Sequence, residues 1–158
     1  MKNLYKFMLL PAMVLPLIFT SCDEDRDDNP TVDLSHVGEN FVLNTPANAA
    51  NNTFDLASAS SLELTCQQPN YGTGVPYFVR YYVQASIDPA FLNDTTVAHK
   101  ELNTAYTSAK MDVNATELNT AVVQLFQKAN PDVPNVPVMP VYLRLRAVIA
   151  GSDANVET

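Results

Sequence analysis

The sequence contains no Trp, two Cys and only four Gly among its 158 residues. Positive charge is also scarce, because nine Lys and Arg residues stand against seventeen Asp and Glu residues, which gives a formal net charge of -8. The scarcity of glycine argues against phosphate-binding loops, and neither G-x-G-x-x-G nor a Walker motif is present. The acidic balance argues against a nucleic-acid partner, which requires a basic face. The sequence therefore indicates an acidic globular chain whose length suits one domain.

Residues 1–22 have the organisation of an export signal. A short lysine-containing region precedes the apolar run Leu9–Phe19, which is too short to cross a bilayer. The segment ends in Phe19-Thr20-Ser21-Cys22, which resembles the lipobox of bacterial lipoproteins. We therefore expect residues 1–21 to be a lipoprotein signal peptide and Cys22 to be lipidated. The alternative is an ordinary signal peptide followed by an incidental Cys.

Five acidic residues are crowded into Asp23–Asp28. Such a run is typical of a solvated, self-repelling segment, and we expect residues 22–39 to form an acidic flexible tether. A calcium loop is the alternative, but the run lacks the Gly and the distal Glu of an EF-hand. An acidic run directly after a lipidated Cys also resembles the surface-export signal of Bacteroidetes lipoproteins. That resemblance implies a lipid-anchored protein of the outer membrane, exposed on the cell surface.

Alternation of apolar and polar residues predicts that residues 40–158 form a domain built mainly of strands. The pattern is cleanest at residues 61–67, where Leu62, Leu64 and Cys66 share one face. Strands are also predicted at 40–46, 53–56, 77–87, 105–113, 141–150 and 155–158, with a long connection of weak periodicity at 90–104.

One helix is predicted between Asn114 and Asn130. Asn114 suits an N-cap, and Glu117 occupies the third position of a capping box. An apolar stripe at helical spacing follows, made of Leu118, Ala121, Val122, Leu125, Phe126 and Ala129. A proline-rich linker then leads to the strand at 141–150, and its prolines are Pro131, Pro134, Pro137 and Pro140.

Short strands with one inserted helix predict an all-β fold, an immunoglobulin-like or fibronectin-like β-sandwich. The last predicted strand has only begun when the sequence stops at Thr158. We therefore expect the last strand to be incomplete and to leave an unpaired sheet edge.

Cys66 is the cysteine left once Cys22 is acylated, so no intrachain disulfide is expected. A nucleophilic thiol needs a base nearby, and the two His residues, His36 and His99, lie in polar segments. Because Cys66 is in phase with Leu62 and Leu64, the pattern favours an inert core thiol. No metal-ligand spacing is present, and we expect neither a metal nor another cofactor.

Acidic residues outside the tether are scattered singly, and their spacing selects no catalytic pair. We therefore expect no enzyme. Arg144 and Arg146, on one face of their strand, are expected to be solvated or to pair across strands with acids such as Glu63.

Carbohydrate binding is the stronger functional hypothesis, because sugars stack on exposed aromatic rings beside polar groups. The candidate glycan-contact residues are Tyr71, Phe78, Arg80 and Tyr82. The alternative is that these rings pack on neighbouring strands. We favour this alternative, partly because the sequence has no Trp.

Several segments taken together carry a family resemblance. They are Cys22 with the acidic run Asp23–Asp28 and Asn29-Pro30-Thr31, Phe41-Val42-Leu43-Asn44-Thr45-Pro46, the segment from Leu62 to Gly72, and Tyr142-Leu143-Arg144-Leu145-Arg146-Ala147. They resemble the N-terminal part of SusE, the outer-membrane starch-utilisation lipoproteins of Bacteroidetes, over essentially the whole chain.

The resemblance implies a cell-surface accessory protein that binds starch or another polysaccharide beside a TonB-dependent transporter complex. It also implies that residues 40–158 are the N-terminal immunoglobulin-like domain, which acts as a non-catalytic spacer. The family's carbohydrate-binding domains lie downstream and are absent from this chain, so no binding residue is carried over. The hypothesis from a different class is a structural or adhesive surface protein that pairs through its sandwich edge.

Overall fold

The computed structural model describes residues 38–46, 49, 53–71, 77–91, 99–150 and 155–158. The predicted signal peptide, the lipidation site Cys22 and nearly all of the predicted tether lie outside the described residues. The described elements, in chain order, are β1 (Val42–Asn44), β2 (Ser61–Gln67), β3 (Val79–Ser86), β4 (Lys100–Tyr106), β5 (Lys110–Asn114), α1 (Ala115–Ala129), β6 (Tyr142–Ile149) and β7 (Asn155–Glu157).

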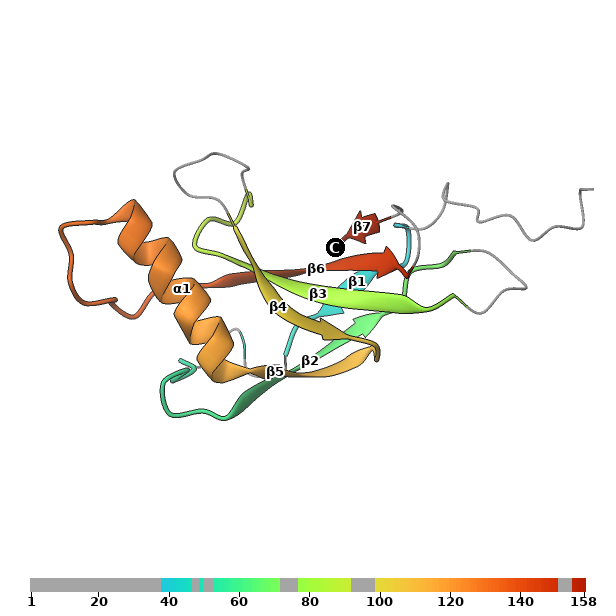
Figure 1. Ribbon diagram of the computed structural model, residues 1–158, viewed down its shortest axis with the longest axis horizontal. Helices are drawn as coiled ribbons and strands as arrows, with labels where there is room; N and C mark the ends of the chain where they lie inside the picture. Colours follow the sequence, from blue (N-terminus) through green and yellow to red (C-terminus); the bar gives the residue numbers. More distant parts are fainter. Residues whose placement is uncertain (1–37, 47–48, 50–52, 72–76, 92–98, 151–154) are drawn as a thin grey trace, which may run out of the picture.

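The strands form two antiparallel sheets, one with the order β1-β2-β5 and the other with the order β4-β3-β6-β7. Figure 1 shows the two sheets lying against each other, with α1 beyond one end. This confirms the prediction of an all-β sandwich with one inserted helix.

The core lies between the two sheets, where the inward residues of each strand meet. In β2 the predicted face of Leu62, Leu64 and Cys66 is buried, as alternation requires. In β3, Tyr81 and Val83 are fully buried against the same core. The inner faces of β5 and β6 add further buried side chains, namely Met111, Val113, Leu145 and Ala147.

Helix α1 closes one end of the sandwich, and its apolar stripe explains why. Leu118, Ala121 and Val122 belong to the same core cluster as the strands, so the helix shares their buried interior. The helix begins where the Oδ1 atom of Asn114 accepts a hydrogen bond from Glu117 N at 3.0 Å. It ends where Asn130 N donates to Phe126 O at 2.8 Å. Both predicted helix boundaries are confirmed.

The sandwich has two distinct ends. The base is the end at which β2 finishes and β3 begins, and the helix end is the opposite one, next to α1. The described chain enters at the base, where a Cβ atom on Gly38 would lie 3.5 Å from Val156 in β7. From the base, β7 runs antiparallel to β6 toward the helix end, and Thr158 N reaches Leu145 O at 3.0 Å.

Three expectations about strands are wrong, and the first two concern residues 53–56 and 90–104. Residues 53–56 form no strand, because Asp55 folds the chain into a turn, accepting hydrogen bonds from Ala57 N (3.1 Å) and Ser58 Oγ (2.7 Å). The predicted connection at 90–104 ends in the first five residues of β4. Leu102 is the one fully buried residue of β4, so this edge strand carries almost no alternating pattern.

The single strand predicted at 105–113 is likewise two strands in different sheets. Its first residues finish β4, and its last residues lie in β5. Between them the chain passes from one sheet to the other, and Ala109 O accepts a hydrogen bond from Cys66 N at 2.9 Å. Small and polar residues alternate throughout this crossing, so the sequence does not show where one strand ends and the next begins.

No helix among the described residues is long and apolar enough to cross a membrane.

Candidate functional site

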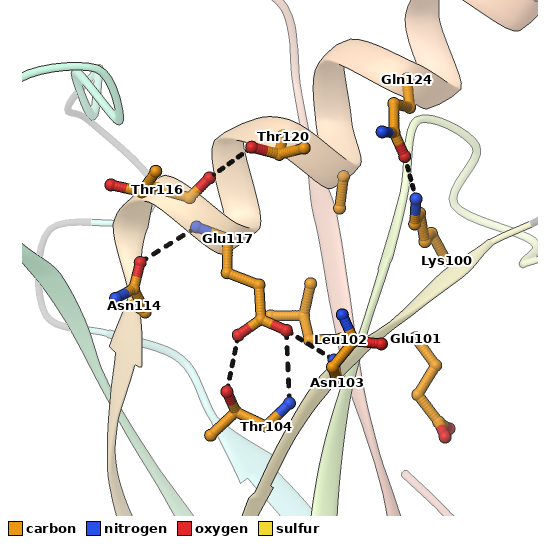
Figure 2. Close-up of a pocket in the computed structure, with 11 residues that line it drawn as sticks. Lys100, Glu101, Leu102, Asn103, Thr104, Asn114, Thr116, Glu117, Thr120 and Gln124 are labelled. Carbon is orange, nitrogen blue, oxygen red and sulfur yellow. Dashed lines mark hydrogen bonds between the residues drawn. The ribbon is translucent and has the colours of Figure 1, made fainter.

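A groove with a volume of about 600 Å³ lies between α1 and β4. Figure 2 shows that side chains from both elements point into it. The lining is mostly polar, with Lys100, Glu101, Asn103, Thr104, Asn114, Thr116, Glu117, Thr120 and Gln124. Lys100 Nζ donates across the groove to Gln124 Oε1, so the two walls are joined by a side-chain contact.

Glu117 is the central side chain of the groove, and it contacts an irregular part of β4. The pairs Tyr82↔Ala105 and Gln84↔Glu101 show that β4 carries extra residues relative to β3. At this bulge the Glu117 carboxylate accepts hydrogen bonds from Asn103 N (2.5 Å), Thr104 N (3.2 Å) and Thr104 Oγ1 (2.7 Å). A carboxylate is a strong acceptor for backbone N–H groups displaced from a regular ladder.

The capping box predicted from Asn114 and Glu117 is therefore only half formed. Asn114 caps the helix as expected, but the Glu117 side chain reaches across to β4. The sequence signal was right about the position of the residue and wrong about its partner. No local pattern could reveal that partner, because Asn103 lies 14 residues away in a segment of weak periodicity.

The outer face of the four-stranded sheet carries a continuous polar network. Arg146 binds Glu101 through Nε (2.7 Å) and Nη2 (2.6 Å). Gln84 bridges the two arginines: its Nε2 donates to Glu101 Oε2 at 2.9 Å, and its Oε1 accepts from Arg144 Nε at 2.6 Å. Arg144 also pairs with Glu157 in β7, with 3.0 Å between Nη1 and Oε2. The network ties together all four strands of the sheet.

Cross-strand pairing was one of the two expectations for the arginines and is confirmed, but Glu63 as their partner is wrong. Glu63 belongs to the other sheet and pairs with Lys110 at 2.7 Å. The sequence reasoning also missed Gln84 and Glu101 as members of the network. The available signal was the polar residue of β3 opposite each arginine: Tyr82 pairs with Arg146 and Gln84 with Arg144.

The network bears on the chemistry that the groove can perform. The hydrogen bonds from Arg146 hold the pKa of Glu101 below its usual value of 4.5, although partial burial opposes this. A general acid for glycoside hydrolysis requires a raised pKa. In Figure 2 the carboxylates of Glu101 and Glu117 point in different directions, and each is bound to its own partners. The arrangement suits structural pairing better than shared acid–base catalysis.

The four predicted glycan-contact residues do not form one surface. Tyr71 is only 6% exposed and packs edge-on against Tyr77, with ring centroids 5.9 Å apart. Tyr82 is half-buried, and the Arg146 guanidinium lies 4.8 Å from its ring centroid. Phe78 is 72% exposed and Arg80 is exposed, and alternation places both on the outer side of the sheet. The site predicted from the sequence therefore retains one freely accessible ring.

A second, smaller cavity of about 240 Å³ lies near the base. Its wall includes Tyr71, Tyr77 and Tyr81. Burial raises the pKa of Tyr81 to about 12, because the charged phenolate would lose its contact with water. These tyrosines line the interior of the fold rather than a surface platform.

Cys66 lies in the core as a free thiol with 8% exposure, which confirms its predicted burial. Burial raises the pKa of this thiol, and the neutral form is a poor nucleophile. His99 packs near Phe91, with ring centroids 6.3 Å apart, and His36 lies outside the described residues. Within the described part of the chain, no three His, Cys, Asp or Glu side chains are grouped so as to hold a metal ion.

One family model, described as SusE outer membrane protein, matches residues 25–145. The match begins within the predicted tether, includes the elements from β1 to α1, and ends at Leu145 in β6. No solved structure matches the chain. The assignment of this sandwich to the immunoglobulin-like folds therefore remains a prediction.

Proposed function

Because this chain belongs to the SusE outer membrane protein family, we propose that it is a non-catalytic module of a cell-surface, glycan-binding accessory lipoprotein. Family membership makes it an outer-membrane accessory protein of a starch-utilisation system. In the proposed role, residues 40–158 act as a spacer that holds carbohydrate-binding domains away from the membrane. Cys22 carries the lipid anchor, and a TonB-dependent transporter complex is the neighbouring machinery.

The observation that carries the spacer role is the path of the chain through the sandwich. Gly38 lies at the base, next to β7, and the tether precedes it. The last strand, β7, then runs from the base toward the helix end. A domain that followed β7 would leave in the direction away from the tether. Two sheets packed on one continuous core hold β7 in this direction.

The aromatic side chains support a spacer rather than a binding platform. Tyr71 is buried by packing at the base, and Tyr82 lies against the Arg146 guanidinium. Sugar stacking needs an open ring face with polar groups beside it. Phe78 offers such a face, so it is the residue to test if binding is detected.

Calorimetric titration of the mature chain with maltoheptaose tests the proposal. We expect no saturable heat at concentrations up to about 1 mM, at which a site with a binding free energy of about −4 kcal/mol would be half occupied. Micromolar binding would overturn the spacer role. The matched variants Phe78→Ala and Arg80→Ala would then show whether the exposed face of β3 is responsible.

The anchor is tested separately, by fractionating cells that produce single-cysteine variants. We expect Cys22→Ala to release the protein from the outer-membrane fraction, because the acyl chains supply the membrane affinity. Cys66→Ala is the matched control and should remain in the membrane. Unchanged membrane association of Cys22→Ala would refute the lipid anchor.

A second candidate function is favoured by the pairing of β7. This strand pairs with only three residues of β6, namely Arg146, Ala147 and Val148, although β6 is eight residues long. Thr158 extends the contact to Leu145, and the edge of β6 from Tyr142 to Arg144 receives no strand from the described residues. A sheet edge of this kind can pair with another chain, as in a structural or adhesive surface protein.

Sedimentation velocity distinguishes the two candidates. A spacer should remain monomeric over a wide concentration range, whereas edge pairing predicts association that grows with concentration. The matched variant carries a longer last strand that covers Tyr142–Arg144. Association that disappears in that variant would favour the adhesive role.

A further inference from the structure

Strand β4 lies at an edge of its sheet, next to β3 in the order β4-β3-β6-β7. An edge strand presents backbone N–H and C=O groups that no neighbouring strand uses, and another chain can pair with them. Strand β4 is seven residues long, and its stretch from Asn103 to Ala105 is exposed and uncharged. Such a stretch is a suitable template for strand addition.

The other edge strands of the described sheets have features that discourage pairing. Strands β1 and β7 are each only three residues long, so they offer few backbone groups. Strand β5 presents the exposed charges of Lys110 and Asp112. Short length and charge are common protections of a sheet edge. The stretch Asn103–Ala105 of β4 has neither, so its protection must come from elsewhere.

The carboxylate of Glu117 in α1 occupies the backbone donors of this stretch. Its Oε1 atom accepts hydrogen bonds from Asn103 N at 2.5 Å and from Thr104 N at 3.2 Å, and Figure 2 shows both. Its Oε2 atom accepts from Thr104 Oγ1 at 2.7 Å. The bulge of β4 allows two successive N–H groups to reach one acceptor. A strand that approached from this side would bring its own C=O groups against the carboxylate, and both are acceptors.

Contacts on either side of Glu117 hold α1 against β4. Leu102 of β4 and Leu118 of α1 belong to one core cluster and are 3% and 1% exposed. Lys100 at the start of β4 donates through Nζ to Gln124 Oε1, further along the helix. The helix cannot leave the strand without exposing this part of the core, so the donors stay covered in the folded state.

We propose that Glu117 closes this edge of the sandwich to strand addition, and that the partner it excludes is β4 of a second copy of this chain. Two copies can pair antiparallel about a two-fold axis near Thr104, with Asn103 of each opposite Ala105 of the other. No like charges oppose this pairing, because the stretch is uncharged. The proposal is independent of the spacer role, and the adhesive role would use a different edge, at β6.

Sedimentation velocity of the unaltered chain and of Glu117→Ala tests the proposal. The substitution removes the acceptor and frees both backbone donors. We expect Glu117→Ala to associate at concentrations at least about tenfold below those that the unaltered chain requires, the factor that corresponds to one hydrogen bond of ordinary strength.

Two matched variants separate an opened edge from a loss of stability. Glu117→Gln keeps a side-chain oxygen for the two N–H groups, and its amide nitrogen can donate to Thr104 Oγ1, so it should associate no more than the unaltered chain. Leu145→Ala creates a cavity at a fully buried site and leaves Glu117 in place. It should also associate no more than the unaltered chain, although it is less stable.

Amide hydrogen exchange, followed by NMR, locates the contact. We expect slow exchange at Asn103 and Thr104 in the unaltered chain and exchange about tenfold faster in dilute Glu117→Ala. In concentrated Glu117→Ala, exchange at both residues should become slow again, because the second copy now accepts their hydrogen bonds. Pairing through β6 would instead protect Leu143.

Four results would overturn the proposal. Fast exchange at both Asn103 and Thr104 in the unaltered chain would do so without any variant. The second is Glu117→Ala that associates no more than the unaltered chain. The third is equal association of Leu145→Ala, which would make instability the cause. The fourth is protection on association at Leu143 rather than at Asn103. Each leaves the spacer role standing, because that role is judged by glycan binding and by the path of the chain.

Discussion

Glu117 belongs to α1, yet its carboxylate accepts three hydrogen bonds from residues of β4. In this way a carboxylate from α1 satisfies backbone N–H groups at the bulge of β4. Removing the acceptor exchanges these hydrogen bonds for bonds to water, and a typical intramolecular hydrogen bond contributes about 0.5–1.5 kcal/mol. The side chains of the groove therefore serve mainly to connect α1 to β4.

We predict that Glu117→Ala, which removes the acceptor of three hydrogen bonds, lowers the free energy of unfolding by about 1–3 kcal/mol in urea titrations. Glu63→Ala is the matched control, because Glu63 pairs with Lys110 on the exposed surface. Surface ion pairs contribute only about 0.2–1 kcal/mol. Equal losses in the two variants would contradict the role assigned to Glu117.

The second residue-scale prediction concerns acid stability. The pKa of Glu101 is lowered by Arg146 in the folded state, so the unfolded chain takes up a proton on this group first. The stability that Glu101 contributes is complete above the unfolded-state value near 4.5 and is lost as the pH falls through the lower folded-state value. We predict that Glu101→Gln flattens the decline in unfolding free energy below this pH. Parallel declines for wild type and variant would show that another carboxyl is responsible.

At the scale of elements, the cap of α1 is the clearest test. Asn114 is the residue that joins β5 to α1, and its side chain accepts a hydrogen bond from Glu117 N at 3.0 Å. We predict that Asn114→Ala lowers the unfolding free energy by about 1 kcal/mol, the usual value of an N-cap. Asn114→Asp should retain the acceptor and most of the stability. A loss for Asp as large as that for Ala would argue that the side chain packs rather than caps.

The elements that could be predicted from sequence are those whose burial follows their own period. Strand β2 has Leu62 and Leu64 inward, and α1 has a complete apolar stripe, so both were located correctly. Strand β4 escaped prediction because it lies at a sheet edge, carries a bulge and buries Leu102 alone. The contact of β4 with Glu117 could not be predicted either, because a contact between separate elements leaves no local pattern.

The candidate site could also be predicted only in part from the sequence. Alternation places Phe78, Arg80 and Tyr82 on one side of the chain at and just before β3, but it does not tell which rings are covered. Tyr82 is covered by Arg146, which arrives from β6 through sheet pairing. Tyr71 follows a strand in a turn cluster, where no period applies, and tertiary packing buried it.

At the scale of the whole molecule, the account makes the sandwich a separator between two ends. The described chain enters at the base, while α1 lies at the helix end. The common core of both sheets and α1 makes the domain one cooperative unit. We predict that Leu145→Ala, which opens a cavity at a fully buried site, costs about 2–5 kcal/mol in urea titrations. A loss confined to α1, with the sheets unaffected in hydrogen exchange, would contradict a single unit.

The most direct measurement of the central claim is the depth of each end above the membrane. The lipidated chain is reconstituted in vesicles with a membrane-bound quencher, and a fluorophore is attached through Asn40→Cys at the base or Lys128→Cys near the end of α1. Both sites are exposed in the described chain. The account predicts strong quenching at position 40 and weak quenching at position 128. Equal quenching at both positions, or stronger quenching at position 128, would contradict the spacer.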